Sequence, residues 1–103
     1  MKDDKKVINQ KTQTIGTTAE VVSEHVFNGQ RVMLLLTNTS VAGEIISLGI
    51  RSEAKALQGI VLNQGDKFIM SKDSGYSPSN DLITALASVN TATLAVHEEI
   101  DPD

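Results

Sequence analysis

The residues of this chain that look most able to do chemistry are His97, Glu98 and Glu99, which follow one another near its end. Imidazole and carboxylate groups bind metal ions and transfer protons. On an extended strand, however, side chains alternate between the two faces, so His97 and Glu99 share a face while Glu98 points away. The sequence offers no third ligand for this pair. We therefore expect a solvated strand end here and no bound metal.

Two other stretches contain side chains of catalytic or ion-binding type. Residues 75–79, GYSPS, place serines beside a glycine, but the final glycine of a G-x-S-x-G nucleophile turn is missing. Asn63 and Asp66 in NQGD carry oxygen ligands, yet a calcium loop needs further carboxylates. No glycine-rich phosphate-binding motif occurs. We expect a surface loop at 74–80, a hairpin turn at 63–66, and a chain that is not an enzyme and uses no cofactor.

The composition is that of one small folded domain. The chain has 103 residues, of which 40% are apolar and 3% aromatic, with no cysteine and a net charge of −4. Without a basic stripe or stacking aromatics, we expect no nucleic-acid partner. The first residues lack the apolar region of a signal peptide, and no apolar run approaches the about 18 residues that cross a bilayer. We therefore expect synthesis in a cytoplasm without export or membrane insertion.

The central element is expected at residues 31–40, RVMLLLTNTS, where five apolar residues precede an abrupt polar run. Its side chains alternate, with Val32, Leu34 and Leu36 on one face and Met33, Leu35 and Thr37 on the other. A strand that is apolar on both faces is covered on both, or docks to a neighbour on one. A helix is disfavoured because the apolar run is short and has no polar face. The pattern predicts the middle strand of a β-sandwich.

Further short strands are predicted at 19–27, 44–50, 59–62, 67–73, 81–88 and 91–99, separated by turn residues. Asn28-Gly29 is a strong hairpin signal, and 51–59 is either a loop or a single helical turn. Residues 7–18 read as an extended arm or an edge strand. The expected fold is all-β: a single antiparallel, jelly-roll-like β-sandwich of seven or eight strands over 19–103, preceded by an extended N-terminal arm at 1–18.

The layout of strands and turns resembles that of small bacteriophage virion proteins. The resemblance spans about residues 28–100 and is carried by RVMLLLTNTS (31–40), ISLGI (46–50), GIVLNQGD (59–66), GYSPSN (75–80), DLITALAS (81–88) and TLAVHEE (93–99). It implies a minor capsid protein of the virion, at vertices as a penton or spike base, or a decoration protein on the head. The partners it implies are the major capsid protein, other virion proteins and further copies of the chain.

Such a protein needs apolar side chains beyond those of one small core. The candidate subunit-contact residues are Val7, Ile8, Ile15, Met33, Leu35 and Tyr76. For Met33 and Leu35 the alternative is ordinary packing in the core, and for the arm it is simple disorder. The arm would become ordered only against neighbouring capsid proteins.

Two other functions remain open from the sequence. One is a carbohydrate- or receptor-binding module of a phage spike or fibre, for which Tyr76 is the candidate stacking residue. The other is a jelly-roll enzyme with a metal bound through His97. These alternatives differ in their ligand, so a glycan or a metal would distinguish them.

Overall fold

The computed structural model describes residues 6–71 and 79–102, which contain eight strands and no helix. The strands are β1 (Val7–Ile15), β2 (Glu20–Ser23), β3 (Gln30–Asn38), β4 (Ile46–Ile50), β5 (Ile60–Leu62), β6 (Lys67–Ser71), β7 (Ile83–Ala87) and β8 (Ala92–Asp101). The predicted all-β class is confirmed. Within these residues no helix is available that could span a membrane.

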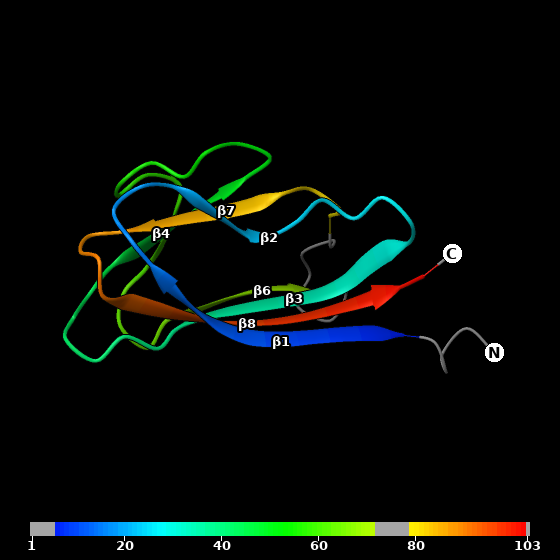
Figure 1. Ribbon diagram of the computed structural model, residues 1–103, viewed down its shortest axis with the longest axis horizontal. Coiled ribbons are helices and arrows are strands. Elements are labelled where there is room, and N and C mark those ends of the chain that lie inside the picture. The colour runs from blue at the N-terminus through cyan, green and yellow to red at the C-terminus, as the bar shows by residue number, and fades with distance from the viewer. Residues whose placement is uncertain (1–5, 72–78, 103) are drawn as a thin grey trace.

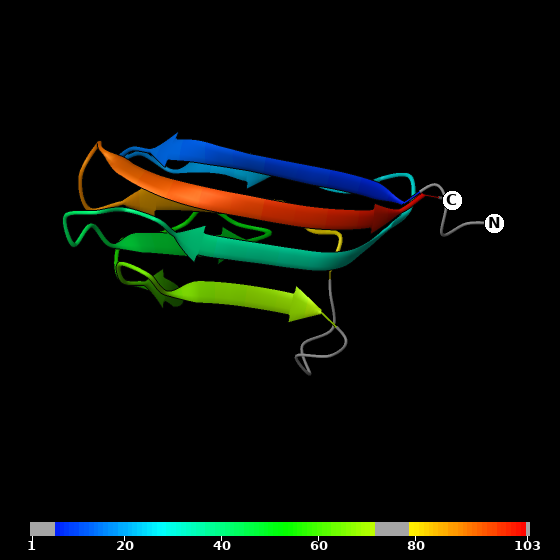
Figure 2. The same cartoon turned by 90° about the horizontal axis from the view of Figure 1, so that it is seen from below.

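The strands form two antiparallel sheets of four, which lie over one another as two layers in Figure 1. The first sheet has the order β1-β8-β3-β6, and the second has the order β2-β7-β4-β5. The first strand pairs with the eighth, the second with the seventh, the third with the sixth and the fourth with the fifth. The chain is thus folded like one long hairpin whose successive strand pairs are distributed between two layers. Figure 2 shows the first sheet from its outer face, which is turned away from the second sheet.

The core lies between the sheets and is built from one face of each. Aliphatic side chains dominate it, as the low aromatic content requires, and alternation along β8 brings Ala92, Leu94 and Val96 inward as predicted. The buried cluster comprises Ile15, Val22, Leu34, Leu36, Ile46, Leu48, Leu62, Met70, Ile83, Ala85, Ala87, Ala92, Leu94 and Val96.

Strand β3 is the middle strand that the sequence predicts, since it pairs with β8 on one side and β6 on the other. Leu34 and Leu36 are fully buried. The prediction that Val32 shares a face with Leu34 and Leu36 is wrong, because the register with β8 shifts between Arg31 and Met33. An irregularity of this kind adds a residue to one strand and reverses the alternation beyond it. Arg31 therefore points into the core, and Val32 is only half-buried.

The two predicted hairpins are also corrected. Asn28-Gly29 lies between β2 and β3, and residues 63–66 lie between β5 and β6, but in both cases the flanking strands belong to different sheets. The local turn chemistry is present: Gly29 has φ 130° and Gly65 has φ 86°. A turn motif in the sequence predicts only the backbone conformation of the few residues that form the turn. The pairing of the strands that it joins depends on where their apolar faces are buried.

Residues 7–15, which the sequence reading counts within the arm, form the edge strand that it offered as the alternative. All nine residues of β1 are in register with β8, from Val7 opposite Ile100 to Ile15 opposite Ala92. Ile15 is fully buried and anchors the end of this strand in the core.

The ambiguous segment 51–59 is an irregular loop that covers the outer face of the second sheet. The hydroxyl of Thr84 accepts a hydrogen bond from the Ala54 backbone N–H at 2.9 Å and donates to the Ser52 carbonyl at 2.7 Å. The hydroxyl of Ser47 accepts one from the Leu57 backbone N–H at 2.9 Å. These bonds satisfy the buried hydroxyls of β4 and β7 and close this face of the sheet.

Candidate functional site

A buried arginine lies at one end of the space between the sheets. The bulge in β3 turns Arg31 inward, and its side chain has no exposed surface. All five N–H groups of its guanidinium donate hydrogen bonds within 2.6–2.9 Å. The acceptors are the Glu98 carboxylate, the Ser23 hydroxyl and the backbone carbonyls of Glu24, Ser79 and Asp81. Arg31 therefore ties both sheets and the segment at 79–81 into one network.

Glu98 is the anionic partner of this network. It belongs to the inward row of β8, directly after Val96, and its Oε2 lies 2.9 Å from Nε of Arg31. Oε2 also accepts a short hydrogen bond from the Ser23 hydroxyl, and Oε1 accepts one from Nδ2 of Asn9 at 3.0 Å. Burial by itself raises the pKa of Glu98, but the hydrogen bonds from Ser23, Asn9 and Arg31 outweigh it, so the pKa is lowered.

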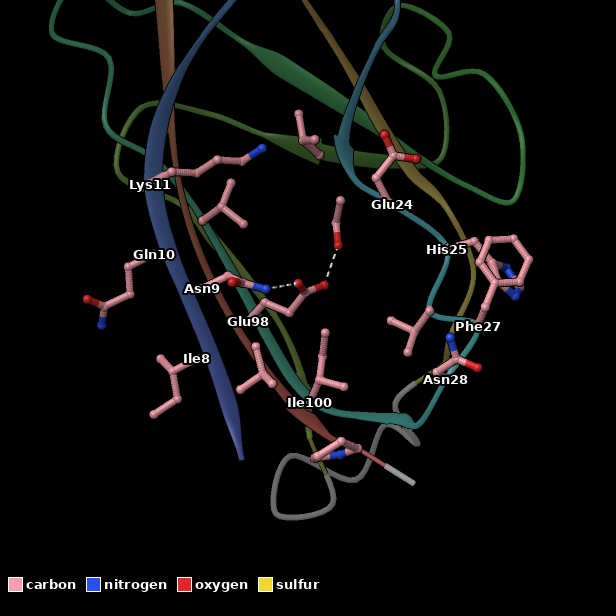
Figure 3. Close-up of a pocket in the computed structure, with 16 residues that line it drawn as sticks. Ile8, Asn9, Gln10, Lys11, Glu24, His25, Phe27, Asn28, Glu98 and Ile100 are labelled. Atoms are coloured by element: carbon pink, nitrogen blue, oxygen red, sulfur yellow. Dashed lines mark hydrogen bonds between the residues drawn. The ribbon is translucent and has the colours of Figure 1, made fainter. Parts of the chain in front are cut away.

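Above this network lies an open groove with a volume of about 730 Å³ (Figure 3). One wall is the inner side of β1 at residues 7–11, the other is the segment at 22–28, and Val96, Glu98 and Ile100 of β8 contribute to the lining. Figure 3 shows Asn9 and Lys11 directed into the groove, with Ile8 and Gln10 on the far side of β1. The groove opens where the first sheet ends at β1 and the second at β2.

The groove holds an unpaired positive charge and an exposed aromatic rim. The Lys11 ammonium on the β1 wall forms no ion pair with any other described residue, whereas the Glu98 carboxylate at the base is paired with Arg31. At its rim Phe27 is 82% exposed and stacks at a tilt on His25, with 4.4 Å between ring centroids. The groove thus combines exposed apolar surface at its rim with the ammonium group of Lys11.

A second surface is the outer face of the first sheet, which is turned away from the core. Alternation and register place on it Ile8 and Gln10 of β1, Met33 and Leu35 of β3, Ile69 of β6, and Ala95, His97 and Glu99 of β8. Leu35 lies opposite Ile69 on one side and His97 on the other. Met33, Leu35 and Ile69 are half-buried, so this face is a mixed apolar and polar surface.

His97 and Glu99 do share a face, as predicted, and they bond to each other at 2.9 Å between Nε2 and Oε2. Nδ1 of His97 contacts Nε2 of Gln10 at 3.1 Å, so both ring nitrogens have partners. The hydrogen bond from His97 is the main reason that the pKa of Glu99 is lowered, and Lys6 at 3.7 Å adds to it. Across residues 6–71 and 79–102, no group of three or more histidine, cysteine, aspartate or glutamate side chains is arranged to hold a metal ion.

The turn at 63–66 is closed by its own aspartate. Oδ2 of Asp66 accepts a hydrogen bond from the Asn63 backbone N–H at 3.0 Å, and the Asp66 backbone N–H donates to the Asn63 carbonyl at 2.9 Å. Asp66 thus stabilises a turn between the two sheets. The serine-containing loop at 75–79 lies outside the described residues except for Ser79.

The six candidate contact residues are placed very differently. Val7 (43% exposed) lines the groove and Ile8 (56% exposed) is on the outer face. Met33 and Leu35 are half-buried on that same outer face, outside the core between the sheets. Ile15 is fully buried in the core, so its side chain packs within its own chain and is removed from the set. Tyr76 lies outside the described residues.

The network around Arg31 and Glu98 is the part of the site that sequence reasoning missed. For Glu98 a signal was present, since it continues the inward row of Ala92, Leu94 and Val96. For Arg31 there was none, because its inward direction depends on the bulge in β3.

Comparison with known proteins adds no assignment: no family model matches the chain, and no curated protein matches it at a significant level.

Proposed function

We propose that this chain is a bacteriophage virion structural protein that acts by packing against other proteins, as a minor capsid component at vertices or as a decoration protein on the head. The observation that carries the proposal is the outer face of the first sheet. There Met33, Leu35 and Ile69 are half-buried, and Ile8, which is more than half exposed, lies on the same face on the other side of Glu99. Apolar side chains gathered on a solvent-facing sheet are typical of protein-contact surfaces.

The strand order supports a jelly-roll form of the proposed β-sandwich. A jelly roll has eight strands in two sheets and arises when a long hairpin is wound into a double layer. The pairing of β1 with β8, β2 with β7, β3 with β6 and β4 with β5 follows this scheme. Viral capsid proteins and lectins both use jelly rolls, so the fold is compatible with the virion role and does not select it alone.

The test is the protein content of particles. Phage particles are purified from cultures of the phage that encodes the chain, washed at high salt and analysed by mass spectrometry. The chain is expected in a fixed ratio to the major capsid protein. Loss of the chain on washing, or its presence only in the lysate, would contradict the proposal.

A carbohydrate- or receptor-binding module is the second candidate. The specific observation in its favour is the exposed ring of Phe27 at the rim of the groove, next to His25. Sugar rings stack on exposed aromatic side chains. Binding on a glycan array that is lost on Phe27→Ala would favour this function, whereas the absence of any glycan binding by the folded chain would dismiss it.

A further inference from the structure

The four outer strands of the two sheets differ in how well they are protected from pairing with another chain. An unprotected edge presents a row of free backbone N–H and C=O groups, which proteins shield with short strands, bulges, prolines or charges. In the described residues β5 has three residues, β6 has five, and β2 has four with a register shift against β7. Strand β1 has nine residues with uninterrupted register against β8. Among the outer strands of the described residues, it is the longest and the most regular.

The free part of this edge is residues 7–12. At Gln13 the side chain turns to the second sheet, where Nε2 donates to the Val21 carbonyl at 3.1 Å and to Oε1 of Glu20 at 2.8 Å. Residues 7–12 are exposed along their whole length and include no proline. Lys11 is their only charged residue, and Figure 3 shows its side chain directed into the groove, so it does not block the edge.

We propose that two copies of this chain pair through β1, antiparallel and about a two-fold axis at Gln10, to form one continuous eight-stranded sheet. Antiparallel pairing about a two-fold axis is an isologous interface, in which each residue of the patch contacts its counterpart on the other copy. The inference does not rest on the virion role.

The side chains select the register. With the axis at Gln10, Ile8 lies opposite Thr12 of the second copy, which is a favourable pair of β-branched residues. Lys11 then lies opposite Asn9. An axis at Lys11 would place two ammonium groups face to face, and an axis at Asn9 would place Val7 opposite Lys11. Moving the axis by one residue changes the register by two, so the inner and outer faces of the two copies stay aligned. Charge and side-chain type therefore decide between the three registers.

Charge complementarity favours a second copy as the partner. In the first sheet Asn9 is in register with Glu98. Placing Lys11 of one copy opposite Asn9 of the other therefore puts that ammonium in the same row as Glu98 of the other copy, and the two-fold axis repeats the arrangement. A surface with both signs of charge is complementary to itself, whereas a surface of a single sign repels its copy.

Cysteine cross-linking tests the axis, and the chain has no cysteine to interfere. Residues opposite each other in an antiparallel pair have Cα atoms about 4.5–5.5 Å apart, within the range that a disulfide bridges. Gln10→Cys is therefore expected to give a covalent dimer under mild oxidation. The control is Thr14→Cys, an exposed residue on the same face of the same strand. Its two copies would be eight residues apart along the ladder, roughly 27 Å, and should not cross-link.

Charge substitutions at the same position test the dimer without oxidation. Gln10→Lys and Gln10→Glu are each expected to weaken dimerisation about two- to fivefold in sedimentation equilibrium, because like charges then face each other. An equimolar mixture of the two variants should recover dimers.

A monomeric chain, or a dimer that cross-links equally through Thr14→Cys, would overturn the inference. A monomer that is nevertheless found in washed particles would overturn the dimer and leave the proposed function standing. A dimer that is absent from particles would overturn the proposed function and leave the dimer standing.

Discussion

Arg31 and Glu98 meet inside the protein with 2.9 Å between Nε and Oε2, although 67 positions separate them in the chain. The arginine side chain has no exposed surface and that of the glutamate is 10% exposed. Burying two charges is costly unless every donor and acceptor is satisfied, and here the surrounding hydroxyl, amide and carbonyl groups satisfy them. Both residues belong to the first sheet, and the Ser23 hydroxyl of β2, which bonds to each of them, joins the pair to the edge of the second sheet directly below the groove.

Removing the arginine should be strongly destabilising. Arg31→Met leaves the Glu98 carboxylate buried without its cation, and we expect the free energy of unfolding to fall by about 3–5 kcal/mol in urea titrations. The matched control is Arg51→Met. Arg51 is 81% exposed in its ion pair with Asp81, so its loss should cost less than about 1 kcal/mol. Equal losses for the two variants would contradict the role of the buried network.

A second substitution should restore part of that stability. In Arg31→Met combined with Glu98→Leu, neither charge remains to be desolvated, so the double variant is expected to be more stable than Arg31→Met alone. The comparison uses the same urea titrations. A double variant whose loss is the sum of the two single losses would show that the two residues do not act together.

Acid should weaken the fold through Glu98. Its pKa is lowered in the folded chain relative to its ordinary value of 4.5, so the native state binds fewer protons than the unfolded state. The stabilisation is present above pH 4.5 and is lost as the pH falls through the folded pKa. Glu98→Gln should therefore show a shallower loss of stability below pH 4.5 than the parent chain.

The remaining acid sensitivity of Glu98→Gln has an expected source. The pKa of Glu44 is also lowered, by hydrogen bonds from the backbone N–H groups of Glu44 and Ala42. The pKa of Asp81 is lowered by hydrogen bonds from Ser79 and Arg51, and that of Glu99 by the hydrogen bond from His97. Because their pKa values are lowered in the folded chain, protonation of these carboxyls at low pH also reduces the free energy of unfolding. A variant with the same acid profile as the parent would show that Glu98 contributes nothing to it.

The loop at 51–59 should depend on a glycine. A Cβ at Gly49 would lie 2.5 Å from the Ser52 carbonyl oxygen and 2.7 Å from the Ala54 nitrogen. We expect Gly49→Ala to cost about 2–3 kcal/mol by forcing the loop off the second sheet. Gly43→Ala is the control: its φ of +76° is strained for alanine, but no atom lies within 4 Å, so about 1 kcal/mol is expected. Thermal unfolding of both variants makes the comparison.

The outer face of the first sheet should matter for assembly and little for folding. Leu35→Thr keeps a residue with strand preference at a half-buried position, so a stability loss of about 1 kcal/mol is expected. Its incorporation into particles should fall sharply when the variant is expressed during infection. Val41→Thr, at a loop residue that is 87% exposed, is the control and should be incorporated like the parent chain. Normal incorporation of Leu35→Thr would contradict a contact role for this face.

Much of the fold could be predicted from the sequence because strand patterns are local. The alternation of Ala92, Leu94 and Val96 is enough to identify a half-buried strand and its inward row, and the apolar run at 32–36 identifies β3. Glycine turns were likewise recognisable at Gly29 and Gly65, since positive φ is a property of single residues.

The tertiary structure alone decided which strands pair and which polar groups are buried. Asn28-Gly29 joins strands of different sheets because burial of apolar faces outweighs the local preference for a hairpin. Arg31 turns inward because one bulge reverses the alternation of β3, and it finds Glu98 only when β3 and β8 lie side by side. The groove exists because two edge strands, β1 and β2, end their sheets on the same side. Such features depend on residues far apart in the chain, and alternation along a single strand carries no information about them.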